Sequence, residues 1–154
     1  MKKLFLGFFA ISILFSCNND NEENDKSQFD YLIFGTSNGE CLGESCTETF
    51  KITNTTLYED ILDTPYRNFE FVALENAKFN QVKDLIKFFP TQLLYQNQTV
   101  FGCPDCLDQG GIYIQYSKNG IIKSWRIDQD KSQIPKYLRS FVVKVNEKIG
   151  IIHN

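Results

Sequence analysis

Residues 111–128, GIYIQYSKNGIIKSWRID, decide the fold because they have the pattern of a β-hairpin. Asn119-Gly120 is the preferred pair for a type I′ turn, in which both central residues adopt positive φ angles. A turn at this position places Ile114 opposite Trp125, and it leaves one face of the hairpin apolar and the other polar. The sequence therefore predicts two antiparallel strands, residues 111–118 and 121–128.

Three stretches that precede this hairpin also have the character of β-strands. Residues 30–34 are mostly apolar, and we expect a buried strand that ends at Gly35. Residues 47–53 alternate polar and apolar side chains, which places the apolar ones on a single face. The third stretch, residues 69–74, is rich in aromatic and aliphatic side chains, which favour strands.

Two segments have the three- and four-residue apolar spacing of an amphipathic helix. The first begins near Asn76, a good N-cap residue, and ends at Pro90. The second begins after Ser132, tolerates Pro135 in its first turn, and ends at Gly150. The apolar stripes are Phe79, Val82, Leu85, Ile86 and Phe89 in the first helix, and Ile134, Leu138, Phe141, Val142, Val145 and Ile149 in the second.

Both predicted helices are apolar on one side only, so both are expected to cover the apolar side of the sheet. The predicted fold class is α+β, with two layers: an antiparallel sheet with two helices packed on one face. Residues 29–154 form this single domain, whose size is ordinary for one core. Hydrophobic residues make up 42% of the chain, which argues against disorder for most of it.

The first part of the chain has the composition of an export signal. Lys2 and Lys3 precede an apolar run, residues 4–15, of about 12 residues, which is too short to span a bilayer. Leu14-Phe15-Ser16-Cys17 then resembles the lipobox that lipoprotein signal peptidase cuts, although Phe15 stands where a smaller residue is usual. We therefore predict that residues 1–16 are a lipoprotein signal peptide and that Cys17 becomes the lipidated first residue.

Residues 17–28 are predicted to be the lipidated cysteine and a flexible acidic tether, because no apolar residue follows Cys17 until Phe29. The Asn/Asp/Glu run resembles the surface-export signal of Bacteroidetes lipoproteins. Asn18 follows Cys17, rather than the aspartate that retains lipoproteins in the inner membrane of enterobacteria. We expect a lipid-anchored protein of the cell envelope, in the outer membrane; its exposure at the cell surface is left open.

The charge of the chain is acidic and gives no sign of a nucleic-acid partner. The formal net charge is −3, and it becomes −5 once Lys2 and Lys3 leave with the signal. Nucleic-acid binding needs a basic surface, so no nucleic-acid partner is expected. No polybasic segment indicates binding to anionic lipid headgroups either. The membrane is therefore expected as a partner through the lipid anchor alone.

Four cysteines remain after Cys17, in two close pairs: Cys41 with Cys46, and Cys103 with Cys106. Export from the cytosol favours disulfides, although the sequence cannot choose the connectivity. A structural zinc site with four cysteine ligands is an alternative, because Cys-Pro-Asp-Cys resembles a zinc knuckle. Thioredoxin-like redox chemistry is a third, but no helix is predicted to begin at this motif and stabilise a thiolate.

Other residues give weaker signals. His153 is the only histidine and lies at the end of the chain, so the residue pattern does not indicate a catalytic triad. Tyr113, Tyr116 and Tyr137 could line a ligand surface, but packing at the edge of the core is the favoured interpretation.

Four motifs stand out in the predicted domain: GECLGESC at 39–46, FGCPDC at 101–106, GGIY at 110–113 and VNEKI at 145–149. They resemble a family of small Bacteroidetes lipoproteins with no assigned activity. The resemblance covers most of residues 30–150 and implies the envelope compartment and a single domain, with no catalytic residue. We expect a non-enzymatic module that binds an unidentified protein or small molecule and uses no cofactor. The alternatives are an envelope thiol–disulfide oxidoreductase that uses the Cys-Pro-Asp-Cys motif, and a zinc-stabilised structural domain.

Overall fold

The computed structural model describes residues 29–37, 47–62, 68–104, 106 and 110–153. The predictions for the signal peptide, the tether, Cys17, Cys41 and Cys46 lie outside these residues. In chain order the strands, α-helices and 3₁₀ helices (η) are β1 Tyr31–Ser37, β2 Thr47–Ile52, β3 Leu57–Asp60, β4 Phe71–Ala73, α1 Asn76–Val82, η2 Lys83–Phe88, η3 Thr91–Tyr95, β5 Val100–Phe101, β6 Gly111–Lys118, β7 Ile121–Asp128 and α2 Lys136–His153.

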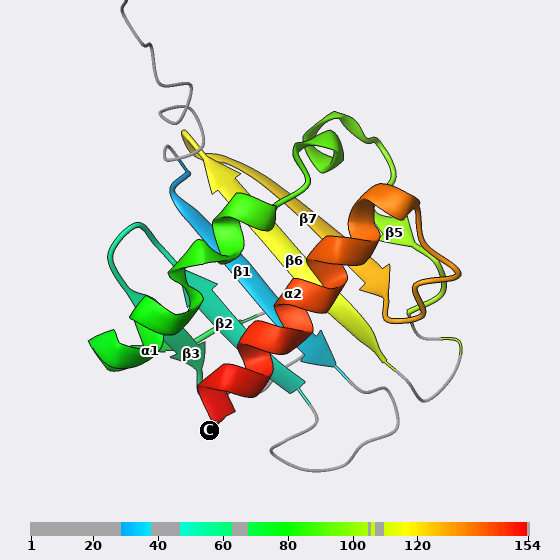
Figure 1. Cartoon of the computed structure of the whole chain (residues 1–154). Coiled ribbons are helices and arrows are strands. Elements are labelled where there is room, and N and C mark those ends of the chain that lie inside the picture. The colour runs from blue at the N-terminus through cyan, green and yellow to red at the C-terminus, as the bar shows by residue number, and fades with distance from the viewer. Residues whose placement is uncertain (1–28, 38–46, 63–67, 105, 107–109, 154) are drawn as a thin grey trace, which may run out of the picture.

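The described strands form one seven-stranded sheet in the order β4-β3-β2-β1-β6-β7-β5 (Figure 1). Neighbouring strands are antiparallel except β5, which pairs with β7 in parallel. The predicted α+β class is confirmed, whereas the wholly antiparallel sheet is wrong at this edge. The reason is the path of the chain: a hydrogen bond from Lys123 on β7 to the Leu94 carbonyl places η3 beside the start of β7. The chain therefore enters β5 from the end where β7 also begins.

The central hairpin has the strands and the register that the sequence predicts. Asn119 and Gly120 have φ angles of 53° and 75°, and Ile114 lies opposite Trp125. Because strand side chains alternate between faces, this register directs both apolar side chains to the face that α1 and α2 cover (Figure 1). Trp125 is buried there, in a core that both predicted helical stripes complete.

The second helix begins and ends later than predicted. It starts at Lys136, directly after Pro135. The predicted cap, Ser132, is instead in the preceding turn, where its N–H donates to the Asp130 side chain at 2.8 Å. Gly150 does not end the helix, because Ile152 is buried in the core and its packing extends the helix to His153. No helix among the described residues is long and apolar enough to cross a membrane.

The first predicted helix is divided into an α-helical part, α1, and a 3₁₀ part, η2. Asn76 is its first helical residue and not its cap, a position taken by Glu75 without a side-chain hydrogen bond. At the junction of the two parts, the Gln81 carbonyl accepts a hydrogen bond from Lys148 of α2. Pro90 follows the end of η2, as predicted.

Gly35 lies inside β1 and does not end the strand, which continues to Ser37. A Cβ at this position would lie 2.2 Å from the carbonyl oxygen of Glu48 and 3.0 Å from the Thr49 Cα on β2. Glycine is therefore needed for the close approach of two strand backbones.

Candidate functional site

The structure joins Cys103 and Cys106 in a disulfide, with Cα atoms 5.3 Å apart. The Cys106 N–H donates to the Cys103 carbonyl at 3.1 Å, which closes a turn after β5. Both residues are exposed. The predicted disulfide is therefore present for this pair, while the predicted sites Cys41 and Cys46 lie outside the described residues.

Asp128, at the end of β7, holds this cysteine turn and was not among the residues predicted from the sequence. Its Oδ2 accepts a hydrogen bond from the Cys103 N–H at 2.8 Å, and its Oδ1 accepts one from the Asp130 N–H at 2.8 Å. Gly102 has a φ of 72°, and a Cβ there would lie 2.5 Å from the Asp128 Cβ. This contact could not be predicted from a local pattern, because Cys103 and Asp128 are 25 residues apart.

The surroundings of the cysteine turn do not favour thiolate chemistry. A reactive Cys-x-x-Cys thiolate is usually stabilised by a helix N-terminus or a nearby cation. Here β6 is the next element of the described chain, and the nearby Asp128 side chain is acidic. A zinc site would need the same sulfurs as thiolates, so it and the disulfide exclude each other. Within the described residues, no three or more His, Cys, Asp or Glu side chains are grouped to hold a metal ion.

Replacing Cys103 and Cys106 with serine is expected to lower the free energy of unfolding by only about 2 kcal/mol, because the closed loop is very short. The hydrogen bond from the Cys103 backbone to Asp128 does not need the sulfur and is retained. Urea denaturation of the double variant measures this difference. A loss above about 4 kcal/mol would contradict the prediction, because it would exceed what the crosslink alone contributes.

The sheet face opposite α1 and α2 carries a second cluster, which we call the Lys51 cluster: Lys51, Tyr31, Tyr58, Phe71 and Gln115. Lys51 lies between two β2 residues buried in the main core, so its side chain projects to the opposite face. Its Nζ lies 4.9 Å from the centre of the Tyr31 ring, 5.6 Å from that of Tyr58 and 5.4 Å from that of Phe71. These distances fit cation–π attraction.

Polar contacts connect the Lys51 cluster to β6. The Gln115 amide donates to the Tyr31 hydroxyl at 3.0 Å, and the Tyr113 hydroxyl donates to the Gln115 Oε1 at 2.8 Å. Phe69 packs between Phe71 and Tyr113, with ring centroids 5.4 and 6.0 Å away. The rings therefore form a continuous surface across the sheet. No local sequence pattern predicts this surface, because the strands that supply it are distant in the chain.

The three tyrosines considered above occupy two different places. Tyr116 stacks on Phe89 of the main core at 4.6 Å between ring centroids. Tyr137 packs against the same core, and its burial raises the pKa of the phenol. The expected packing role is confirmed for these two residues, whereas Tyr113 is buried on the opposite sheet face beside the Lys51 cluster.

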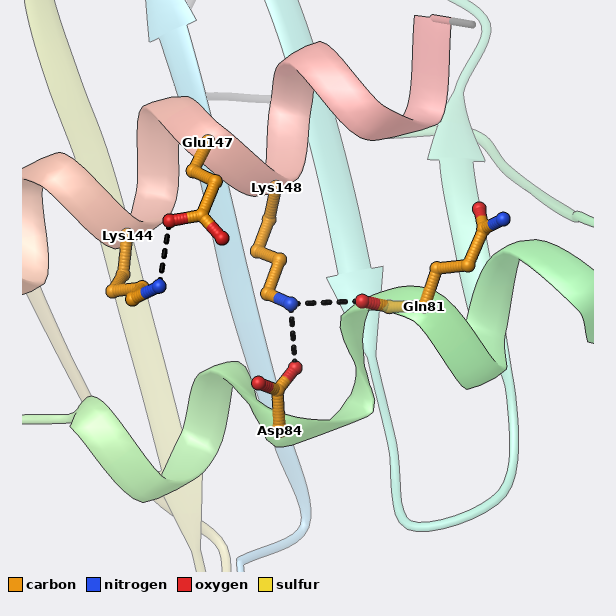
Figure 2. A network of polar contacts seen from close by, with 5 residues as sticks. All are labelled: Gln81, Asp84, Lys144, Glu147 and Lys148. Carbon is orange, nitrogen blue, oxygen red and sulfur yellow. Dashed lines mark hydrogen bonds and ion pairs between the residues drawn. The ribbon is translucent and has the colours of Figure 1, made fainter.

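A buried ammonium group connects the two helices. Figure 2 shows the Lys148 side chain pointing from α2 to the junction of α1 and η2. Its Nζ donates to the Gln81 carbonyl at 2.8 Å and pairs with the Asp84 carboxylate at 2.7 Å. The Lys148 side chain is 7% exposed, whereas that of Asp84 is 47% exposed. The neighbouring Lys144–Glu147 pair lies at the surface of α2.

His153 lies at the end of α2, where its Nε2 contacts the Glu48 carboxylate.

The chain matches no known protein-family model and no curated protein.

Proposed function

We propose that this protein is a lipid-anchored binding module of the cell envelope, held in the outer membrane through Cys17, and that the Lys51 cluster is its ligand site. One observation carries the choice of site. An ammonium group lies over three half-buried aromatic rings, on the sheet face away from the helices. The family resemblance supports the compartment and does not supply a ligand.

The cluster has the chemistry to bind an acidic oligosaccharide. Aromatic rings offer flat apolar faces, which suit the C–H face of a sugar ring, and Lys51 offers N–H donors for a carboxylate. Gln115 adds an amide beside them. No nucleophile lies beside a base within the cluster, which supports binding over catalysis.

The experiment is an NMR titration of the purified mature protein with a defined panel of uronic-acid oligosaccharides. We expect saturable shifts in the resonances of Tyr31, Lys51 and Tyr58. Lys51→Met should weaken binding by about tenfold or more, as expected for loss of a charge-assisted hydrogen bond to the ligand carboxylate. Lys144→Met is the matched control. Lys144 is on α2, away from the cluster, and its Nζ also lies over an aromatic ring, 5.2 Å from the centre of the Phe88 ring.

Two outcomes would contradict the proposed ligand site. One is a titration in which no acidic oligosaccharide shifts the resonances of the cluster. The other is equal binding by the Lys51→Met and Lys144→Met variants. The anchor is tested separately by the intact mass of the native product, which should begin at an acylated Cys17.

Thiol–disulfide exchange is a second candidate function, favoured by the exposed Cys103–Cys106 disulfide. It requires a reduced form with one unusually acidic, accessible thiol, which alkylation at a series of pH values measures. The Asp128 carboxylate beside the turn argues against it. The third candidate, a zinc-stabilised domain, requires reduced cysteines and zinc that co-purifies, and elemental analysis tests it.

A further inference from the structure

We infer that the end of the domain where the tether joins is a docking surface for the lipid bilayer that holds the anchor. This inference rests on the proposed acylation of Cys17 and adds a second, non-covalent contact with the membrane. The tether-end surface consists of Tyr95, Ile121 and Ile122 with the lysines Lys83, Lys87, Lys118 and Lys123.

The junction with the tether is fixed to the β6–β7 turn. The Asp30 N–H donates to the Ser117 carbonyl at 2.8 Å, and the Asp30 Oδ2 accepts from the Ser117 hydroxyl at 2.8 Å and from the Gly120 N–H at 3.0 Å. The Gly120 N–H, followed by the Ser117 hydroxyl, lowers the pKa of Asp30 below its ordinary 3.8. Figure 1 shows the start of β1 beside the tip of this hairpin.

The length of the tether keeps this end of the domain close to the bilayer. Residues 17–28 connect the proposed anchor to Phe29, and twelve extended residues span at most about 40 Å. The domain therefore stays within contact distance of the lipid surface, and the hairpin tip is the part tied most directly to the tether.

Exposed apolar side chains lie at this end, on both faces of the hairpin. Ile121 and Ile122, directly after the turn, are 67% and 56% exposed, and Tyr95 is 84% exposed. The hydrogen bond from Lys123 to the Leu94 carbonyl brings η3, which carries Tyr95, to the side of the hairpin. Exposed apolar groups that gather in one region mark an interaction surface, and tyrosine is enriched where a membrane meets water.

Lysines from separate elements lie at the same end of the domain. Lys118 and Lys123 lie on the two hairpin strands next to the isoleucines. On η2, Lys83 and Lys87 line a hollow of about 370 Å³, whose wall includes Phe29 at the tether junction. Lysine suits a membrane interface because its stem is apolar and its ammonium pairs with anionic headgroups.

Two acidic residues lie among these lysines, and both have partners. Asp30 is bonded to the β6–β7 turn, and Asp84 pairs with Lys148. The sequence has no polybasic segment, and the lysines of this surface come from separate elements. The fold brings lysines from η2, β6 and β7 to one end of an acidic domain.

The test uses the full acylated protein in vesicles of phosphatidylethanolamine and phosphatidylglycerol, with and without bromine on the acyl chains. The variants are Ile122→Trp and its matched control Ile61→Trp, since Ile61 is 53% exposed and follows β3 at the opposite end of the sheet. The one native tryptophan, Trp125, is buried and gives the same background in both. We expect bromine to quench the new tryptophan at position 122 by about half or more, because interfacial groups insert about 5–10 Å, and to leave the control unchanged.

Each failure has a distinct meaning. Equal quenching in the two variants, or none at position 122, in protein that is acylated and floats with the vesicles, overturns the docking surface and leaves the anchor in place. A native product without acyl chains overturns the proposed anchor and, with it, this inference.

Discussion

Replacing Gly35 with alanine is expected to lower the free energy of unfolding by about 3 kcal/mol or more, because the new methyl group has no space. Its Cβ would meet the Glu48 carbonyl oxygen at 2.2 Å, and a backbone atom in a central pair of strands cannot move aside as a flexible side chain can. Urea denaturation followed by Trp125 fluorescence measures the loss, and circular dichroism identifies a variant that fails to fold.

Gly150→Ala is the matched control and should have the opposite sign. A Cβ at Gly150 meets nothing within 4 Å, and the residue lies inside α2. Alanine in a helix is favoured over glycine by about 1 kcal/mol, so this variant should be more stable than the native protein. A Gly35→Ala protein as stable as the native one would show that β1 and β2 do not approach as closely as described.

Asp84→Ala is expected to cost about 2–3 kcal/mol, more than Lys148→Met, although the two changes break the same ion pair. Removal of Asp84 leaves the buried Lys148 ammonium with the Gln81 carbonyl as its remaining described partner (Figure 2). Lys148→Met removes the charge and keeps an apolar stem, while the Asp84 carboxylate stays solvated because it is about half exposed. The unpaired Gln81 carbonyl then costs about 1 kcal/mol.

Glu147→Ala provides the reference for an exposed ion pair on the same helix. The Lys144–Glu147 contact lies at the surface, where such pairs contribute about 0–1 kcal/mol. Denaturation of the three variants in one buffer gives the predicted order: Asp84→Ala, then Lys148→Met, then Glu147→Ala. A larger loss in Lys148→Met than in Asp84→Ala would show that the packing of the lysine stem, and not its charge, connects the helices.

The parts of the fold that the sequence predicted are those that local patterns determine. The Asn119-Gly120 turn sets the register of two strands, and the helical stripes select which residues are buried. The errors occur where distant contacts override local preference. Gly35 is a strand breaker by propensity but a point of close approach in the sheet, and Gly150 is kept in a helix by the packing of Ile152.

The candidate sites divide in the same way. The sequence predicted disulfides among four cysteines without choosing their partners, and the Cys103–Cys106 bond comes from the structure; nothing local connects Asp128 to it. The Lys51 cluster depends on which strands are neighbours in the sheet, and the sequence of a single strand does not determine that order. The grouping of the lysines in the tether-end surface could not be predicted for the same reason, because they come from separate elements.

The two borders of the sheet, β4 and β5, are three and two residues long. Such short edge strands expose few unpaired peptide groups, so they are poor templates for strand addition by another molecule. Proteins confined to a membrane plane meet their own copies far more often than proteins free in solution. Under the proposed lipid anchor, such borders would let the domain be dense in the membrane plane and still resist polymerising edge to edge.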